Sequence, residues 1–283
     1  MALLEAQGLN KSFGSVVAAN NITVSIEERE IIGIIGANGA GKTTFVNMVT
    51  GYLKPTSGKI VYQGRDITQL PPREITRIGI CRSFQVPQVF MTLSVFDNLL
   101  IALGAAELEE AISYNRFLGD VINKSSKIDA PLWRTLYIAG TLSWMWPFLL
   151  ARMVPILLPR FLSILWAPRL RRPDLMKAAD EIIERYGIGD YRDLEAGMLP
   201  QGVRKLLDIG MAMAHNPKMI LLDEPTSGVS VHEKFGIMDV VMEALKETGV
   251  TVLFIEHDME IIERYGERVL AFADGAIISD GSP

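Results

Sequence analysis

A short run of glycine, lysine and threonine residues near the N-terminus has the composition of a phosphate-binding loop. The run, with the residue that follows it, is Gly36-Ala37-Asn38-Gly39-Ala40-Gly41-Lys42-Thr43-Thr44. It fits the pattern G-x-x-x-x-G-K-S/T, in which glycines let successive N–H groups converge on a phosphate oxygen at the start of a helix. Lys42 would reach the terminal phosphates of a nucleotide, and the Thr43 hydroxyl could ligate Mg²⁺. A glycine-rich turn that only joins a strand to a helix is the alternative.

Two acidic residues follow an apolar segment much later in the chain. The segment 219–222 leads directly into Asp223 and Glu224. A carboxylate at the end of a buried strand can hold Mg²⁺ through water, so we expect Asp223 to be the metal partner of Thr43. Glu224 would then orient and deprotonate the attacking water. Without the glycine loop, the pair could equally be a capped strand end.

A histidine follows another apolar segment, 251–255, as Glu256-His257. A lone histidine is more often structural than functional. His257, however, would leave the carboxyl end of a parallel strand, where open α/β sheets bind their ligands. We therefore expect His257 to contact the γ-phosphate.

The elements that must position these residues follow from the hydrophobic pattern. The run 31–35 is continuously apolar, which is typical of a strand buried on both faces, and it precedes a helix at 43–49. A helical pattern covers 231–248 and ends at Gly249. This alternation of strands and helices predicts a parallel α/β sheet. Residues 1–70 predict short strands, with breaks at 14–15 and at 20–21, and residues 86–215 are mostly helical.

Composition excludes several classes of protein. The chain has 283 residues, a net charge of −5 and 22% charged residues, which argues against a disordered chain and against non-specific nucleic-acid binding. Cys81 is the single cysteine of the sequence, so a disulfide scaffold and a multi-cysteine zinc site are excluded. The N-terminus lacks the pattern of a signal peptide, and we expect a cytosolic chain.

Taken together, the motifs resemble those of the ATP-binding-cassette (ABC) transporter ATPases over nearly the whole chain. Phe13 resembles the aromatic residue that stacks on adenine. Gln85, in the segment 82–85, resembles the glutamine that touches Mg²⁺ and relays to the membrane subunit. His257, in 255–258, resembles the switch histidine. The resemblance implies a P-loop NTPase core with a mainly parallel sheet, an antiparallel β subdomain and an inserted helical subdomain. It implies one nucleotide-binding domain over 1–283, with the core at 1–85 and 216–283 and the helical subdomain at 86–215.

The family's signature segment departs from its usual Leu-Ser-Gly-Gly-Gln wording. It appears here as Leu199-Pro200-Gln201-Gly202-Val203. Pro200 removes the hydroxyl that would bond the γ-phosphate held by the opposite subunit, although the Gly202 N–H and a helix start remain. Ser230 stands where an acid is common. We infer a heterodimer with a second, different ABC ATPase; a homodimer with two weakened signatures is the alternative.

A segment near 112–172 is unusually apolar and basic. It contains all four tryptophans, Trp133, Trp144, Trp146 and Trp166, and it accounts for the mean hydropathy of +0.23. The uncharged stretch 136–151 is shorter than the roughly 20 residues that a transmembrane helix needs, and Pro147 interrupts it. Three hypotheses remain: a membrane-spanning hairpin, hydrophobic helices packed within the helical subdomain, or helices at the cytosolic membrane face or against a permease.

Within the family, the motif wording most resembles one ATPase subunit of branched-chain amino-acid importers. The resemblance implies ATP hydrolysis with Mg²⁺, coupled to solute uptake through integral membrane permease subunits and indirectly through a substrate-binding protein. It places the chain peripherally at the cytoplasmic face of the inner membrane, with no nucleic-acid partner. Relatives of the subfamily serve urea, amides and aromatic acids. The alternatives are an ABC ATPase that drives export or lipid extraction, and a non-transport ABC switch protein.

Overall fold

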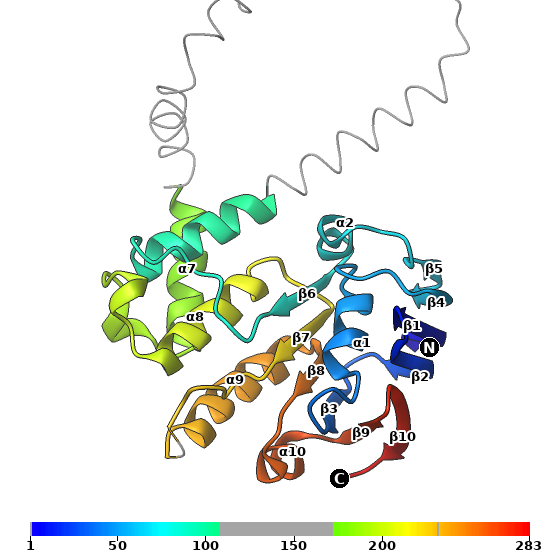
Figure 1. Ribbon diagram of the computed structural model, residues 1–283. Helices are drawn as coiled ribbons and strands as arrows, with labels where there is room; N and C mark the ends of the chain where they lie inside the picture. The colour runs from blue at the N-terminus through cyan, green and yellow to red at the C-terminus, as the bar shows by residue number, and fades with distance from the viewer. Residues whose placement is uncertain (1, 108–171, 231) are drawn as a thin grey trace, which may run out of the picture. The chain divides into compact units, whose positions relative to one another are not determined.

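The structure is a computed structural model of the chain, and it describes residues 2–107, 172–230 and 232–283 (Figure 1). Apart from Arg172, the apolar segment expected near 112–172 lies outside the described residues, so the three hypotheses about it stay predictions. The chain divides into two compact units, residues 1–103 with 178–283, and residues 104–177. The sheets and the site described below belong to the first of these units.

The predicted parallel α/β sheet is confirmed. Within the described residues it has six strands, of which β10 is antiparallel to β9 and the other five run parallel. In spatial order they are β10 (Ala276–Gly281), β9 (Arg268–Ala273), β3 (Ile31–Gly36), β8 (Thr251–Ile255), β7 (Met219–Asp223) and β6 (Ile80–Ser83). Every residue of β7 and β8 is buried, as their continuous apolar runs predict. Ile255 of β8 pairs with both Ile34 and Asp223, so β3, β7 and β8 end at nearly the same level.

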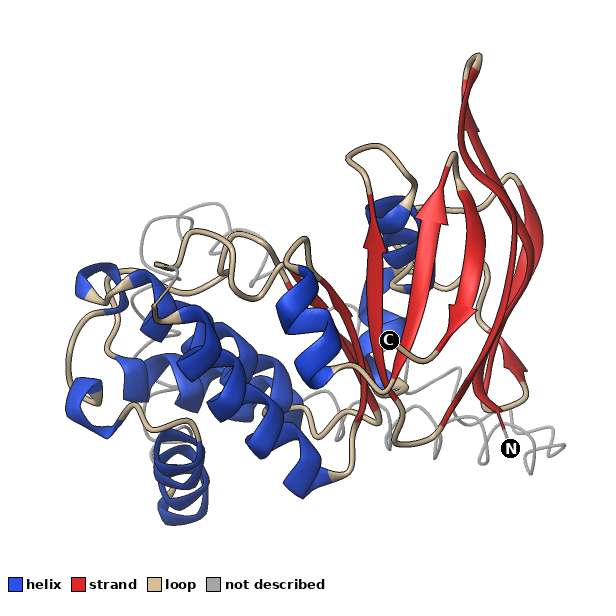
Figure 2. Ribbon diagram, turned by 90° about the horizontal axis from the view of Figure 1, so that it is seen from below, coloured by secondary structure: helices blue, strands red, loops and turns tan. Residues whose placement is uncertain are grey.

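A second sheet is entirely antiparallel, as the expected β subdomain requires. Its strands, in spatial order, are β2 (Val16–Glu27), β1 (Ala2–Phe13), β4 (Ser57–Tyr62) and β5 (Arg65–Asp66). Helix α1 (Lys42–Val49) lies between the two sheets (Figures 1 and 2). The ring of Phe45 in α1 lies 5.7 Å from that of Phe272 in β9, and both belong to a buried cluster that also contains Ile22 of β2. This cluster fixes the helix that follows the glycine loop.

One predicted turn is wrong. Asn20 and Asn21 were expected to break a strand, but β2 continues through both of them. Asn21 has a φ of 49°, and the pairing shifts its register between Leu9 and Lys11 of β1. Asparagine tolerates this left-handed conformation, and the Asn21 N–H finds a partner in Asn10 Oδ1 at 2.8 Å. The asparagine pair therefore forms a bulge within the strand instead of a turn between two strands.

The other helices of the described residues are α2 (Pro72–Arg77), a helix over residues 95–107, α7 (Pro173–Arg185), α8 (Gln201–Met213), α9 (Lys234–Thr248) and α10 (Met259–Tyr265). Ile75 of α2 belongs to the same buried cluster as α1. In β3, Ile34 faces α1, whereas a Cβ on Gly33 would lie 2.8 Å from Ile262 Cδ1 of α10, so α10 packs on the opposite face. Within the described part of the chain, no helix has the length and apolar character needed to cross a membrane.

The helix predicted at 231–248 begins later than expected. Helix α9 starts at Lys234, after a segment that carries a turn at 225–228 and Ser230, and it ends as predicted before Gly249, whose φ is 66°. The Ser230 hydroxyl donates a hydrogen bond to Glu233 Oε2 at 2.7 Å. Serine competes for local hydrogen bonds in this way, which favours a turn over a helical start.

Candidate active site

The glycine loop joins β3 to α1 as the motif requires. Gly36 and Gly41 have φ values of 150° and 101°, which side chains other than glycine rarely adopt. A Cβ at Gly36 would lie 2.4 Å from Phe272 O, and one at Gly41 would lie 2.7 Å from Ala18 O. Both glycines are therefore required by backbone conformation and by the close approach of neighbouring strands. The predicted strand, loop and helix are confirmed here.

The Lys42 ammonium lies within the curl of this loop. Its Nζ atom donates hydrogen bonds to Gly36 O at 2.7 Å and Ala37 O at 3.0 Å, and the residue is only 6% exposed. Burial lowers the pKa of Lys42, while the negative charges of Glu224 and Asp223 act in the opposite direction. The two acids thus lie close enough to act on the ammonium, although they are about 180 residues away in the sequence.

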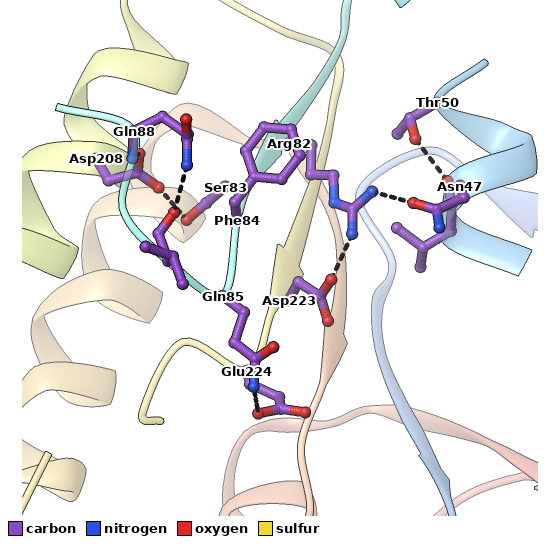
Figure 3. A network of polar contacts seen from close by, with 12 residues as sticks. Asn47, Thr50, Arg82, Ser83, Phe84, Gln85, Gln88, Asp208, Asp223 and Glu224 are labelled. Atoms are coloured by element: carbon purple, nitrogen blue, oxygen red, sulfur yellow. Dashed lines mark hydrogen bonds and ion pairs between the residues drawn. The ribbon is translucent and has the colours of Figure 1, made fainter. Parts of the chain in front are cut away.

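Glu224 meets two of the other expected site residues. Gln85 Nε2 donates a hydrogen bond to Glu224 Oε2 at 2.6 Å (Figure 3), and His257 Nε2 lies 3.1 Å from Glu224 Oε1. The three residues follow β6, β7 and β8, which are adjacent strands, so the sheet brings them to one edge. Each carboxylate oxygen has a partner, which fixes the plane of the carboxylate.

Asp223 has a partner that the sequence did not reveal. The Arg82 guanidinium forms an ion pair with Asp223 Oδ2 through Nη2, and through Nη1 it donates to Asn47 Oδ1 at 2.6 Å (Figure 3). The side chains of Arg82 and Asp223 are 7% and 9% exposed. Because Asn47 lies in α1, this contact joins the helix that carries Thr43 to the end of β7. The pairing of Thr43 with Asp223 through a metal remains a prediction.

The donor set around Asp223 suits Mg²⁺. The expected ligands are the Thr43 hydroxyl, the Gln85 amide oxygen and the Asp223 carboxylate, all of them the hard oxygen donors that this ion prefers. In the part of the chain that the structure describes, no group of three or more His, Cys, Asp or Glu side chains could hold a metal by itself. A metal held by one carboxylate, a hydroxyl and substrate phosphates agrees with both observations.

Phe13 and the signature segment lie at separate places. Phe13 is the last residue of β1 and is 53% exposed, and Lys11 Nζ lies 5.3 Å from the centroid of its ring. Helix α8 begins at Gln201, and Pro200 provides no side-chain hydrogen bond to cap it. Gln201 Nε2 donates to Ser227 O at 3.2 Å. The first N–H groups of α8 are therefore left without a cap from Pro200.

The Arg82–Asp223 pair leads to a stability prediction. Replacing Arg82 by methionine should lower the stability of the nucleotide-free chain by about 3–5 kcal/mol, because Asp223 would keep a buried charge without its partner. Arg264→Met is the matched control, because the Arg264–Asp239 pair is about half exposed and should be worth at most about 1 kcal/mol. Thermal unfolding of both variants measures the difference. Equal losses would show that Asp223 does not depend on Arg82.

Known proteins share both the sequence and the fold. Residues 19–227 match the family described as ABC transporter. The chain is 30% identical to the probable branched-chain amino acid transport ATP-binding protein LivG of Archaeoglobus fulgidus, over 99% of this chain and 90% of the relative. It is 29% identical to the high-affinity branched-chain amino acid transport ATP-binding protein BraF of Pseudomonas aeruginosa, over 99% and 92%. The crystal structure of the ADP conformation of an ATP-binding cassette of an ABC transporter matches with a TM-score of 0.71 and 30% identity, over 100% and 92% of the two chains.

These matches agree with the geometry of the site. The glycine loop, the acids at the end of β7 and the histidine after β8 all lie at the edge where α/β sheets bind nucleotides. The chain therefore belongs to the ABC transporter family, and it is an ATP-binding subunit with the ATP-hydrolysing cassette of that family.

Proposed function

We propose that the chain hydrolyses Mg·ATP at this site to drive the import of branched-chain amino acids, or of a related solute such as urea, an amide or an aromatic acid. The observation that carries the proposal is the placement of Glu224 between Gln85 and His257, at the edge that also holds the Lys42 loop. The solute class rests on the full-length relatives, which are named as branched-chain amino acid transport proteins.

The side chains of the site have different roles in phosphoryl transfer. Lys42 exchanges the carbonyls of Gly36 and Ala37 for the β- and γ-phosphates, where its charge offsets that of the transferred group. Residues 36–44 enclose the phosphates, and Phe13 stacks on the adenine. Thr43, Asp223 and Gln85 would hold Mg²⁺, which neutralises charge on the phosphoryl oxygens when it is bound. Glu224 orients the attacking water and accepts its proton, and His257 contacts the γ-phosphate.

A second cassette completes the assembly. We propose that the segment 199–202 and the uncapped start of α8 face the nucleotide of a partner ATPase, whose own signature faces the Lys42 loop. Pro200 offers no hydroxyl to that nucleotide, and the Ser230 hydroxyl is bonded to Glu233 of the same chain. Both features favour a heterodimer with two unequal sites. Sedimentation of the chain alone with Mg·ATP decides the matter, because a homodimer would form without a second subunit.

The partner at the membrane is proposed to be a permease, which would hold the chain peripherally at the cytoplasmic face of the inner membrane. The segment after Gln85 supports this, because Val86, Phe90 and Met91 are exposed large apolar side chains. The backbone of Phe90 is held firmly: Asn98, which is fully buried, accepts from Phe90 N at 2.8 Å and donates to Phe90 O at 3.1 Å. An exposed apolar ring on a firmly held backbone, near the glutamine segment, suits a stable protein contact.

Replacing Phe90 by aspartate should break this contact without harming the ATPase site. We expect the variant to lose co-purification with the permease and the transport-coupled part of ATP hydrolysis, while basal ATPase activity stays within about 2-fold, because surface substitutions rarely cost more than about 0.5 kcal/mol. Ile278→Asp is the control, since Ile278 is exposed on β10. A Phe90→Asp variant that still co-purifies with the permease would contradict the contact.

The proposed function is tested by isolating the chain with its partners from membranes and assaying its ATPase activity with candidate solutes and their binding protein. Stimulation by a binding protein loaded with a branched-chain amino acid, or with one of the related solutes, supports import of that solute. Stimulation by a lipid or by an exported compound without a binding protein would favour export or extraction instead. Isolation with ribosomes or DNA and no permease would favour a non-transport switch protein.

A further inference from the structure

Helix α8 places a lysine in the interior of the protein, close to the active site. Lys205 lies one turn after the helix begins and is 0% exposed. Its Nζ atom donates hydrogen bonds to three backbone carbonyls: Glu224 O at 3.2 Å, Phe84 O at 3.4 Å, and Gln85 O. One ammonium group therefore joins the segment that follows β6 to the residue that follows β7.

Asp208 adds a second attachment from the same helix, one turn further on. Its carboxylate accepts hydrogen bonds from Ser83 Oγ at 2.6 Å and from Gln88 N at 2.7 Å (Figure 3). These residues stand at the two ends of the segment 83–88, which contains Gln85. Helix α8 thus holds this segment at both ends through Asp208 and in the middle through Lys205.

The contact of Lys205 with Glu224 falls at a strained position. Glu224 has a φ of 50°, a left-handed conformation that costs about 1–2 kcal/mol for a residue with a side chain. Three backbone hydrogen bonds hold the residue there: Glu224 N donates to Ile255 O at 3.1 Å, and Glu224 O accepts from Ser227 N at 3.0 Å and from Lys205 Nζ at 3.2 Å. The direction of the Glu224 carboxylate depends on this conformation.

Burying the charged ammonium group of Lys205 costs free energy, because the group loses its contact with water. Burial lowers the pKa of Lys205, and the charges of Asp208, Glu224, Glu256 and Asp223 act against that shift. A buried ion pair that does no more than stabilise a fold can often be replaced as a whole by apolar side chains at little cost. Lys205 instead directs two of its three hydrogen bonds at the backbone carbonyls of Gln85 and Glu224, whose side chains meet at 2.6 Å.

We propose that Lys205 is a positioning residue for ATP hydrolysis: its buried ammonium ties the backbone of Gln85 to that of Glu224, so that the Glu224 carboxylate keeps its productive direction. This inference rests on the proposed function, in which Glu224 handles the attacking water. The hydrogen bonds of the Lys205 ammonium go to backbone carbonyls, so it acts through Glu224 and Gln85. An arginine could make the same hydrogen bonds to carbonyl oxygens, whereas methionine, of similar length, could make none.

The test compares Lys205→Met and Lys205→Arg with the wild-type chain in the purified transporter complex. We expect Lys205→Met to lower kcat about 10–100-fold, because small misplacements of a reacting group cost this much, while Mg·ATP affinity changes less than about 3-fold. Lys205→Arg should recover most of kcat. Lys246→Met is the matched control, an exposed lysine of α9 that should change neither quantity. If Lys205→Met fails to fold, Lys205→Gln, which keeps two donors, is judged by the same split between kcat and affinity.

A double substitution separates this inference from the proposed function. In a chain that already carries Glu224→Gln, adding Lys205→Met should lower kcat by less than about 3-fold further, because both substitutions impair the same step. If Lys205→Met lowers kcat as much in the Glu224→Gln chain as it does in the wild-type chain, the role of Lys205 is overturned. An unchanged kcat in a folded Lys205→Met chain would overturn it as well. If Glu224→Gln alone leaves the rate unchanged, the proposed role of Glu224 fails, and the role of Lys205 fails with it.

Discussion

Replacing Glu224 by glutamine is expected to slow ATP hydrolysis by roughly 10²–10⁴-fold, the usual size of a general-base contribution, while Mg·ATP still binds. Glutamine keeps the shape of the side chain and can still bond to Gln85 and His257, which hold the two carboxylate oxygens in the wild-type chain. It cannot accept the proton of the attacking water. Single-turnover hydrolysis and nucleotide binding, measured on the same preparation, separate the two effects.

The matched control is Glu263→Gln, an exposed acid of α10 whose loss should leave hydrolysis unchanged. A Glu224→Gln chain that turns over ATP at the wild-type rate would remove Glu224 from its proposed role. A variant that loses binding as well would show that the carboxylate acts on the bound nucleotide in the ground state, and not on the water alone.

Replacing Lys42 by methionine is expected to weaken Mg·ATP binding by about 30-fold to several thousand-fold. Removal of one partner from a buried, hydrogen-bonded charge pair costs about 2–5 kcal/mol, and the phosphates would lose their nearest cation. The fold should survive, because the two carbonyls that Lys42 contacts, Gly36 O and Ala37 O, belong to a loop shaped by its glycines. Equilibrium binding of a fluorescent ATP analogue measures the loss.

Lys59→Met is the control for charge alone. Lys59 is about half exposed and lies 3.6 Å from Asp66, in the antiparallel sheet. Its replacement removes the same charge from the chain at a place away from the loop. If both variants bind Mg·ATP as tightly as the wild-type chain does, the phosphates do not lie in the curl ahead of Lys42.

The sequence predicted those parts of the site that depend on residues adjacent to one another in the sequence. The glycine loop, the acids at the end of β7 and the histidine just after β8 each stand at the end of an apolar strand, so that local pattern and parallel topology together place them at one edge. The contact of Gln85 and His257 with Glu224 agrees with their expected grouping. The roles of these residues in binding and hydrolysis stay predictions.

Residues that act across the sheet could not be found in this way. Arg82 meets Asp223 only because β6 lies beside β7, and no spacing in the sequence reveals that neighbour. Lys205 and Asp208 reach the segment 83–88 from a helix more than 100 residues further along the chain. One signal was present: a lysine and an aspartate stand three residues apart in α8 among the apolar residues Leu206, Leu207 and Ile209, and all five are buried. Buried charges of this kind indicate a specific partner.

The strand content was less well predicted than the parallel core. The strand pattern at 1–70 was expected to be interrupted, yet β1 and β2 have 12 residues each. Asn21 could be a turn residue or a bulge residue, and only pairing with β1 selects the bulge. Conversely, β7 and β8 were predicted closely because each is a short, continuous apolar run, which is typical of a strand buried on both faces.

The most direct measurement for the whole account is a calorimetric titration of the purified chain with ATP, with and without Mg²⁺, repeated on the Lys42→Met and Asp223→Asn variants. We predict saturable binding of one nucleotide per chain, strengthened by Mg²⁺ in the wild type, weakened at least about 30-fold in the first variant and no longer Mg²⁺-dependent in the second. A wild-type chain with no measurable affinity for Mg·ATP, or one whose affinity neither substitution changes, would contradict the account.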